Sequence, residues 1–240
     1  MPDACFADPR LAACYDALDP DRSDLEVYAA IVQELDCGSV LDVGCGTGTF
    51  ACMLARRGID VVGVDPAAAS LDVARAKPGA ARVRWIHGDV GTAGALGVDL
   101  TVMTGNVAQV FVGDAEWSAT LGAVRTALRP GGSFVFESRV PGDEAWRSWK
   151  KAQSHVHADV HGVGRVEHWV EVTLVDGPLV TFRGTYSFPS GAVMTSTSTL
   201  RFRTCDELSR SLTEEGFVLT GVRDAPDRPG REYVLLAARP

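Results

Sequence analysis

One segment decides the fold: Val40-Leu41-Asp42-Val43-Gly44-Cys45-Gly46-Thr47-Gly48-Thr49-Phe50. An apolar run leads into three glycines at alternate positions, and a helical pattern starts directly after them. Glycine has no side chain, so the main chain can pass close to a ligand and offer it amide N–H groups. The segment therefore predicts a strand, a binding loop and a helix in succession.

Short apolar runs alternate with helical patterns from about residue 39 to residue 138. We predict strands at 39–43, 61–64, 82–86, 98–103 and 133–137. Asp65-Pro66 has the pattern of a helix-capping residue followed by proline at the first helical position. A further helix begins near Asp114, and Leu128 is the last residue of its apolar face. Repeated units of this size predict a parallel sheet covered on both faces, with ligands at the carboxyl ends of the strands.

The pattern changes to two-residue alternation after Ser138. Three strands, at about 166–174, 180–188 and 193–203, predict an antiparallel meander. Thr204 and Glu207 then have the spacing of a capping box, and Gly216 can end the helix that follows. Two last strands are expected at 217–222 and 232–238. The chain is therefore an α/β fold with an antiparallel insertion.

The charge distribution and the lack of recognisable targeting patterns disfavour some classes of function. The net charge is −8, and residues 1–138 hold 10 Lys and Arg against 18 Asp and Glu, whereas residues 139–240 hold 13 of each kind. Because no basic stripe appears, a nucleic-acid partner is disfavoured. No apolar run reaches the length of a membrane span, and the start of the sequence lacks a signal-peptide pattern. We expect a cytoplasmic protein without a membrane partner.

The six cysteines form no Cys-x-x-Cys pair, and five of them lie in the first 52 residues. Without a secretion signal this pattern predicts free thiols, with neither a disulfide framework nor a zinc site.

The glycine spacing distinguishes between three kinds of nucleotide-binding loop. A dinucleotide-binding loop has the pattern G-x-G-x-x-G, but here the third glycine comes one position early. A phosphate-binding P-loop needs Gly-Lys-Ser/Thr, which is absent. The segment resembles motif I of the class I S-adenosylmethionine-dependent methyltransferases, whose pattern is acidic-x-G-x-G-x-G. Asp42, Gly44, Gly46 and Gly48 match every fixed position of that motif.

The resemblance extends over roughly residues 39–138 and implies where S-adenosylmethionine would bind. Asp65, at the end of the second strand, would accept hydrogen bonds from the ribose hydroxyls, and Asp89 with Val90 would hold the adenine. Arg22 would pair with the cofactor carboxylate, and Tyr15 would face the sulfonium. The cofactor-binding residues predicted in this way are Tyr15, Arg22, Asp42, Gly44, Cys45, Gly46, Asp65, Pro66, Asp89, Val90, Met103 and Thr104.

Some of these residues also have a purely structural interpretation. Asp65 can be an N-cap, Asp89 a turn residue, and the segment from Tyr15 to Arg22 an ordinary piece of surface. The three glycines in register with acidic residues at three strand ends favour the cofactor interpretation.

No catalytic residue is assigned from the sequence. His155, His157, His161 and His168 are candidates for a general base, with surface-loop and packing roles as the alternative, and no metal site is expected. Glu137 and Asn106 follow the fifth and fourth strands, where a polar group of a substrate could be held. The aromatic residues of the insertion either form its core or line an apolar acceptor pocket: Trp146, Trp149, Phe182, Tyr186 and Phe188.

The resemblance implies a Rossmann-like sheet of order 3-2-1-4-5-7-6 with strand 7 antiparallel. We expect four parts: a helical lid at 1–38, the cofactor-binding core at 39–138, an insertion covering the substrate at 139–203, and the last helix and strands at 204–240. The expected activity is methyl transfer from S-adenosylmethionine to nitrogen or oxygen of a small-molecule acceptor. The alternatives are an NAD(P)-linked oxidoreductase and a catalytically silent cofactor-binding protein. Both a monomer and a homodimer remain open.

Overall fold

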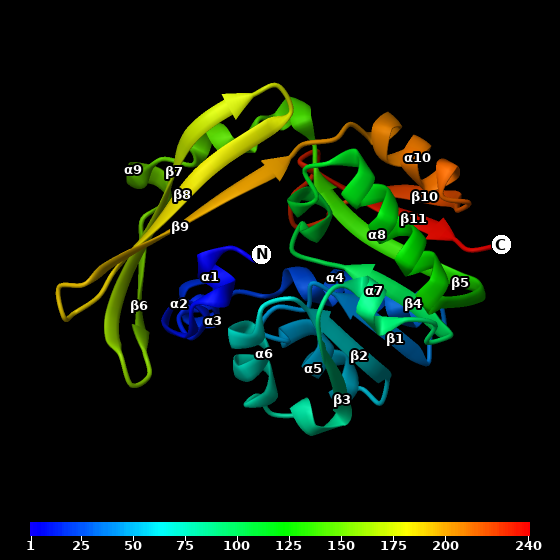
Figure 1. Ribbon diagram of the computed structural model, residues 1–240, viewed down its shortest axis with the longest axis horizontal. Helices are drawn as coiled ribbons and strands as arrows, with labels where there is room; N and C mark the ends of the chain where they lie inside the picture. Colours follow the sequence, from blue (N-terminus) through cyan, green and yellow to red (C-terminus); the bar gives the residue numbers. More distant parts are fainter.

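The larger of two sheets has seven strands in the order β3-β2-β1-β4-β5-β11-β10. In the computed structural model, which describes residues 1–240, β11 runs antiparallel to both β5 and β10 (Figure 1). The predicted order 3-2-1-4-5-7-6 is therefore confirmed. The strands are β1 (Ser39–Val43), β2 (Asp60–Asp65), β3 (Val83–His87), β4 (Val98–Met103), β5 (Leu128–Arg139), β10 (Val218–Asp224) and β11 (Glu232–Ala238).

Helices cover both faces of this sheet. One apolar cluster includes Leu25 of α4 (Asp24–Glu34), Phe50 of α5 (Thr49–Arg56) and Val135 of β5. The other includes Trp117 of α8 (Asp114–Ala127) and Phe134 of β5, together with residues of α10 (Cys205–Glu214). Because side chains alternate along a strand, neighbouring residues of β5 enter opposite clusters. This burial on both faces explains the continuous apolar runs of the central strands.

The insertion forms the second sheet, which is antiparallel and has the order β6-β7-β8-β9. Its strands are β6 (Val156–Val160), β7 (Gly164–Asp176), β8 (Leu179–Ser187) and β9 (Val193–Arg201). The prediction of three strands missed β6, which pairs with the start of β7. The register of β7 against β8 shifts between Val172 and Leu174, and Leu174 is 57% exposed.

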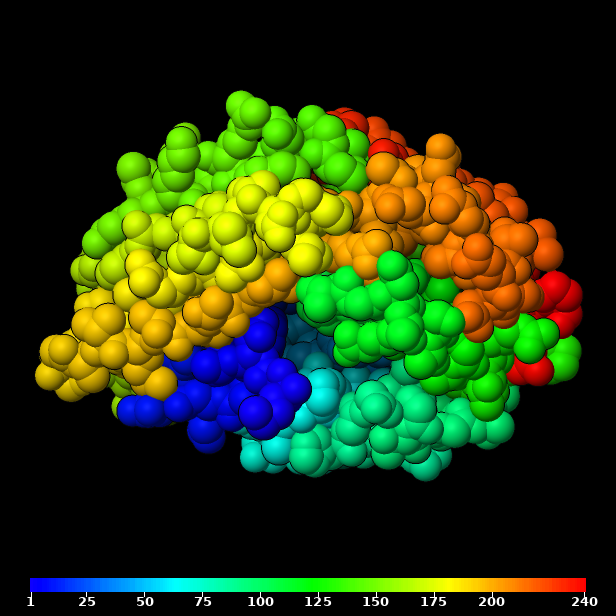
Figure 2. Space-filling view, turned by 45° about the horizontal axis from the view of Figure 1, so that its top comes forward, coloured from blue at the N-terminus to red at the C-terminus, as the bar shows by residue number.

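Three short N-terminal helices lie between the two sheets: α1 (Ala4–Ala7), α2 (Pro9–Ala12) and α3 (Tyr15–Leu18). They contact α6 (Ala68–Arg75) of the core and also strands β6 and β9 of the insertion. Cys14 is fully buried against Val160 and Val166 of the insertion. Figure 2 shows a hollow bordered by this blue segment, the insertion and the green residues that follow β4.

The remaining short elements complete the chain and include no helix long and apolar enough to cross a bilayer. They are the helices α7 (Val90–Ala93) and α9 (Lys151–Ser154) and the 3₁₀ turns η1 (Ala80–Arg82), η2 (Val107–Val110), η3 (Pro141–Asp143) and η4 (Ala145–Ser148).

Two predicted helix ends were wrong. Helix α6 begins at Ala68 and not at Pro66, because Asp65 Oδ1 accepts the Ala67 N–H and keeps that residue extended. Leu128 lies in β5 rather than in α8, although its side chain packs in the same cluster as that helix. The Leu128 side chain packs beside the apolar face of α8, and for this reason its position in the sequence continues the helical spacing of that face.

The predicted capping box at the start of α10 is confirmed. Thr204 Oγ1 accepts the Glu207 N–H at 3.2 Å, and Glu207 Oε2 accepts the Thr204 N–H at 2.8 Å. Two amide groups that the helix cannot satisfy internally are thus paired.

Thr204→Ala is expected to lower the free energy of unfolding by about 1 kcal/mol, because both reciprocal bonds are weakened or lost. Urea denaturation measures this change. Thr213→Ala, at an exposed position in the last turn of the same helix, is the matched control. An equal loss in the two variants would contradict the capping role.

Candidate functional site

The glycine loop after β1 is shaped by its packing against the protein itself. All three glycines have positive φ angles, of 69° at Gly44, 52° at Gly46 and 75° at Gly48. A Cβ atom at Gly44 would lie 2.6 Å from Val107, and one at Gly48 would lie 2.5 Å from Trp85. At Gly46 the nearest atom is a backbone oxygen 4.0 Å away. The loop is therefore closed at its two ends and open at Gly46.

Most amide groups of the loop are paired within the protein. Gly44 N–H and Cys45 N–H both donate to the carbonyl of Val64, at 2.9 and 3.2 Å. Gly46 N–H donates to Asp65 Oδ2 at 2.8 Å. We expected these amides to be available to a ligand, whereas in the structure they bind acceptors at the end of β2. Between Gly44 and Gly48, only the Thr47 N–H has no partner.

Two buried carboxylates lie beside the loop. Asp42 is 2% exposed, and its Oδ2 atom has no hydrogen-bond partner. Burial, followed by the negative charge of Asp65, raises the pKa of Asp42 to about 7. Burial also raises the pKa of Asp65, against the effect of the Ala67 and Gly46 N–H groups that its carboxylate accepts. Asp42 and Asp65, two of the predicted acidic residues, thus lie close together because β1 and β2 are adjacent parallel strands.

The turn after β3 holds Asp89 and Val90. Asp89 is exposed, and its Oδ1 atom accepts both the N–H and the hydroxyl of Thr92, at 3.0 and 3.1 Å. Asp89 is therefore the N-cap of α7, and the buried Val90 is the first residue of that helix. Gly88 N–H donates to the carbonyl of Asp65 at 3.0 Å, so this turn is fastened to the end of β2.

The N-terminal candidates lie near the loop as well. Burial raises the pKa of Tyr15, whereas the charge of Arg22 acts in the opposite direction. Arg22 pairs with Asp24 at 3.3 Å and also lowers the pKa of Asp42. Tyr15, Arg22 and Asp42 therefore lie within electrostatic reach of one another, although they come from separate elements.

The predicted cofactor-binding residues at the ends of β2 and β4 are Pro66, Met103 and Thr104, and they differ in solvent accessibility. Met103 is fully buried in the apolar cluster on the α8 side of the sheet. Thr104 is half-buried and Pro66 is exposed.

A second group of contacts fastens the N-terminal helices to the glycine loop. Asp16 Oδ1 accepts the Thr47 hydroxyl at 2.7 Å, and Asp16 Oδ2 pairs with Lys77 Nζ at 2.6 Å. Lys77 also donates to the Thr49 hydroxyl at 2.7 Å. Sequence reasoning missed this group because Lys77 lies far along the chain and belongs to no motif.

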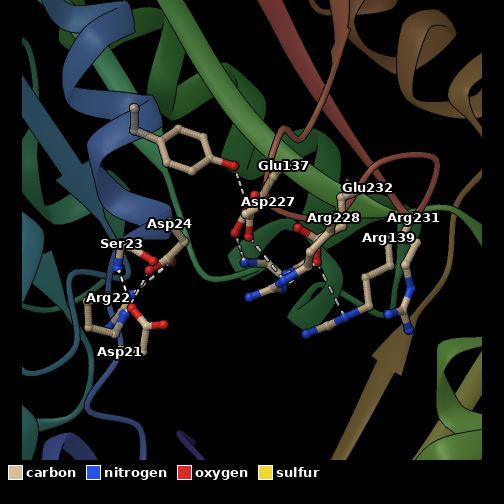
Figure 3. A network of polar contacts seen from close by, with 12 residues as sticks. Asp21, Arg22, Ser23, Asp24, Glu137, Arg139, Asp227, Arg228, Arg231 and Glu232 are labelled. Carbon is tan, nitrogen blue, oxygen red and sulfur yellow. Dashed lines mark hydrogen bonds and ion pairs between the residues drawn. The ribbon is translucent and has the colours of Figure 1, made fainter.

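A buried polar network lies at the carboxyl ends of β4 and β5 (Figure 3). The Tyr28 hydroxyl donates to Glu137 Oε2, and Asn106 N–H donates to Glu137 Oε1 at 2.9 Å. Asn106 Nδ2 reaches Glu232 Oε1 at 3.1 Å. Burial and the neighbouring Glu232 raise the pKa of Glu137. The sequence located Glu137 and Asn106 at strand ends but gave no signal for Tyr28 or Glu232.

The histidines of the insertion do not converge on one point. His155 pairs with Glu167 at 3.2 Å, whereas His168 stacks on Tyr186 at 4.3 Å and bonds to the Thr185 carbonyl. Burial lowers the pKa of His168. No group of three or more His, Cys, Asp and Glu side chains that could hold a metal occurs in the structure. All six cysteines are free thiols.

The aromatic residues of the insertion pack against one another and against the segment that follows β9. Trp149 lies 4.9 Å from Phe182, and Trp146 lies 4.5 Å from Phe202, in edge-on geometries. Trp149 also lines a cavity, so it belongs both to the packing and to a surface that a ligand can reach.

Asp42 gives a pH-dependent prediction. Its pKa is raised from 3.8 to about 7 in the folded protein, so the folded state retains a proton that the unfolded chain loses. Ionisation of Asp42 therefore destabilises the fold as the pH rises from about 4 to about 7. We expect Asp42→Asn to raise the melting temperature more at pH 8 than at pH 5. Asp60→Asn, at the exposed start of β2, is the control. A shift of equal size at both pH values would contradict this assignment.

Comparison with known proteins identifies the domain. Residues 40–132 match the family model described as "Methyltransferase domain". The biotin biosynthesis bifunctional protein BioHC of Cellvibrio japonicus is 31% identical over 134 residues, which are 52% of this chain and 25% of that protein. The chain therefore spans about a quarter of the length of this curated relative.

Solved structures of low sequence identity share the fold over nearly the whole chain. A S-adenosylmethionine-dependent methyltransferase from Clostridium acetobutylicum has a TM-score of 0.74 and 16% identity, covering 95% of this chain and 97% of that one. The sugar N-methyltransferase KedS8 from Streptoalloteichus sp. has a TM-score of 0.75 and 19% identity, covering 94% and 90%. The comparisons thus show a methyltransferase domain over residues 40–132 and, for nearly the whole chain, the fold of these solved structures.

Proposed function

We propose that this protein transfers a methyl group from S-adenosylmethionine to a nitrogen or oxygen atom of a small-molecule acceptor. The observation that carries the proposal is the pair of buried carboxylates, Asp42 and Asp65, beside a glycine loop that is open at Gly46. The similarity to a sugar N-methyltransferase supports a small-molecule acceptor. The acidic composition argues against a nucleic-acid acceptor.

The residues beside the loop fit the polar groups of the methionine portion. Asp42 Oδ2 is buried without a partner, and an ammonium group would satisfy it. The unpaired Thr47 N–H is a donor on the same loop, and the Arg22 guanidinium can pair with a carboxylate. Tyr15, which lies near Arg22, would flank the sulfonium.

Asp65 and Asp89 fit the nucleoside portion. Each oxygen of Asp65 accepts one N–H group, and a carboxylate oxygen has capacity for a second bond, so the ribose hydroxyls can be held there. Asp89 is exposed, with Val90 as its buried neighbour, and this pair would hold the adenine. When bound, the cofactor supplies a methyl group on a sulfonium with a neutral leaving group.

The remaining task of the protein is to align the acceptor and exclude water. The N-terminal helices contact both the core and the insertion, so they can cover the cofactor while the insertion covers the acceptor. We assign residues 1–38 and 139–203 to this covering role. Asn106 and Glu137 at the ends of β4 and β5 would border the acceptor, and no residue is assigned as the catalytic base.

The cofactor assignment is tested by titrating the purified protein separately with S-adenosylhomocysteine and with NAD. We expect binding of S-adenosylhomocysteine alone, followed by consumption of S-adenosylmethionine when a panel of amines, amino sugars and phenols is added. Binding of NAD alone would favour an oxidoreductase and overturn the proposal. Tight cofactor binding without turnover across the panel would favour a silent binding protein.

Asp65→Ala is expected to weaken binding of S-adenosylhomocysteine by about 1.5–3 kcal/mol, because hydrogen bonds to a charged group are lost. Isothermal titration calorimetry measures the affinity, and thermal melting verifies that the variant is folded. Asp60→Ala, on the same strand but at its opposite and exposed end, should leave the affinity unchanged. A folded Asp65→Ala variant with wild-type affinity would refute the assigned role.

A further inference from the structure

A cavity of about 190 Å³ lies beside the polar network at the carboxyl end of β5. Its walls come from β5, from the turns before β6 and from the loop between β10 and β11. The residues that matter for its chemistry are Arg139, Arg228, Arg231, Asp143, Glu232 and Trp149. Three arginines thus line one cavity in a protein whose net charge is −8.

Each arginine is paired along one side and leaves other donors unpaired. Arg139 donates from Nη1 to Gln109 at 3.0 Å, and its Nε lies 3.7 Å from Glu232. Arg228 donates from Nη1 to the same Glu232 oxygen at 2.8 Å. Glu232 is therefore the acidic partner of two of the three arginines, and it is only 3% exposed.

Arg228 and Arg231 have additional acidic partners. Arg228 Nε pairs with Asp227 at 3.2 Å, and Arg231 Nε pairs with Asp143 at 3.0 Å. The Nη2 groups of all three arginines and Nη1 of Arg231 have no protein partner. A guanidinium presents five N–H donors, so these cations retain the capacity to bind an oxyanion.

The cavity adjoins the region where the acceptor would lie. Glu232, in its wall, accepts a hydrogen bond from the Asn106 side chain at 3.1 Å. Asn106 also donates its N–H to Glu137 at the end of β5. Figure 3 shows Glu137 and Glu232 near Arg139, Arg228 and Arg231. A molecule held by the arginines can therefore extend toward the loop after β4.

We propose that this cavity binds an oxyanionic group, a phosphate or a carboxylate, carried by the methyl acceptor. This inference rests on the proposed function and narrows its substrate class to anionic small molecules. A volume of about 190 Å³ corresponds to roughly six water molecules, which is room for a phosphate or carboxylate group. The planar forks of Arg139, Arg228 and Arg231 match the geometry of such groups. Anchoring one end of the acceptor orients its nucleophilic atom and lowers the entropic barrier to transfer.

The test measures binding of inorganic phosphate and of acetate to the full chain by isothermal titration calorimetry. We expect phosphate or acetate to bind the wild-type protein at millimolar concentration, and the stronger of the two identifies the anionic group. Arg231→Gln should weaken that binding roughly 10- to 100-fold, as expected for a lost hydrogen bond between charged groups. Arg228→Gln should act in the same direction.

Arg183→Gln is the matched control. Arg183 lies on the insertion, is 49% exposed and pairs with Glu171, whereas Arg231 is 52% exposed and pairs with Asp143. The control should leave anion binding unchanged. Failure of the wild-type protein to bind either anion, or unchanged anion affinity in a folded Arg231→Gln variant, would overturn the inference.

Binding of S-adenosylhomocysteine, measured on the same proteins, separates this inference from the proposed function. If the wild-type protein binds S-adenosylhomocysteine but neither anion, the anion site is wrong and the proposed function stands. If it binds an anion but not S-adenosylhomocysteine, the proposed function is wrong, and the assignment of the anion to a methyl acceptor is wrong with it. We expect Arg231→Gln to retain wild-type affinity for S-adenosylhomocysteine while losing affinity for the anion.

Discussion

The hydrogen bond from the Gly46 N–H to Asp65 Oδ2 holds the end of β2 against the loop after β1. The same carboxylate accepts the Ala67 N–H through its other oxygen, so one side chain sets the path of two loops. The carbonyls of Val64 and Asp65 accept three further amides, from Gly44, Cys45 and Gly88. The turns after β1, β2 and β3 are thereby fixed relative to one another, and the candidate cofactor site consists of these turns.

Several buried carboxyl groups lie at the carboxyl edge of the sheet. Asp42 and Glu137 are both buried, and burial raises the pKa of each. A buried carboxylate is unfavourable unless it is protonated or paired. Glu137 and Glu232 are paired through Tyr28, Asn106 and two arginines, whereas Asp42 Oδ2 is left without a partner. The proposed cofactor role of Asp42 rests on this difference.

The N-terminal helices connect the candidate site to the insertion. Asp16 and Lys77 fasten α3 to the glycine loop, while Cys14 is buried against the second sheet. Tyr15 and Arg22 lie in the same N-terminal segment. The hollow in Figure 2 lies between this segment, the insertion and the residues that follow β4.

The sequence by itself determined what depends on local order. The strands of the core, the glycine loop, the capping box at Thr204 and the acidic residue at the end of β2 were predictable, because each rests on periodicity or on residues close together in the chain. The strand order was predicted only through the resemblance to the methyltransferase family. Only the tertiary structure decided that the loop amides pair with β2, that the insertion has a fourth strand, and that Arg139, Arg228 and Arg231 line one cavity. These features join residues far apart in sequence, and their geometry depends on how the sheet twists and on which side chains remain unpaired, neither of which a local pattern records.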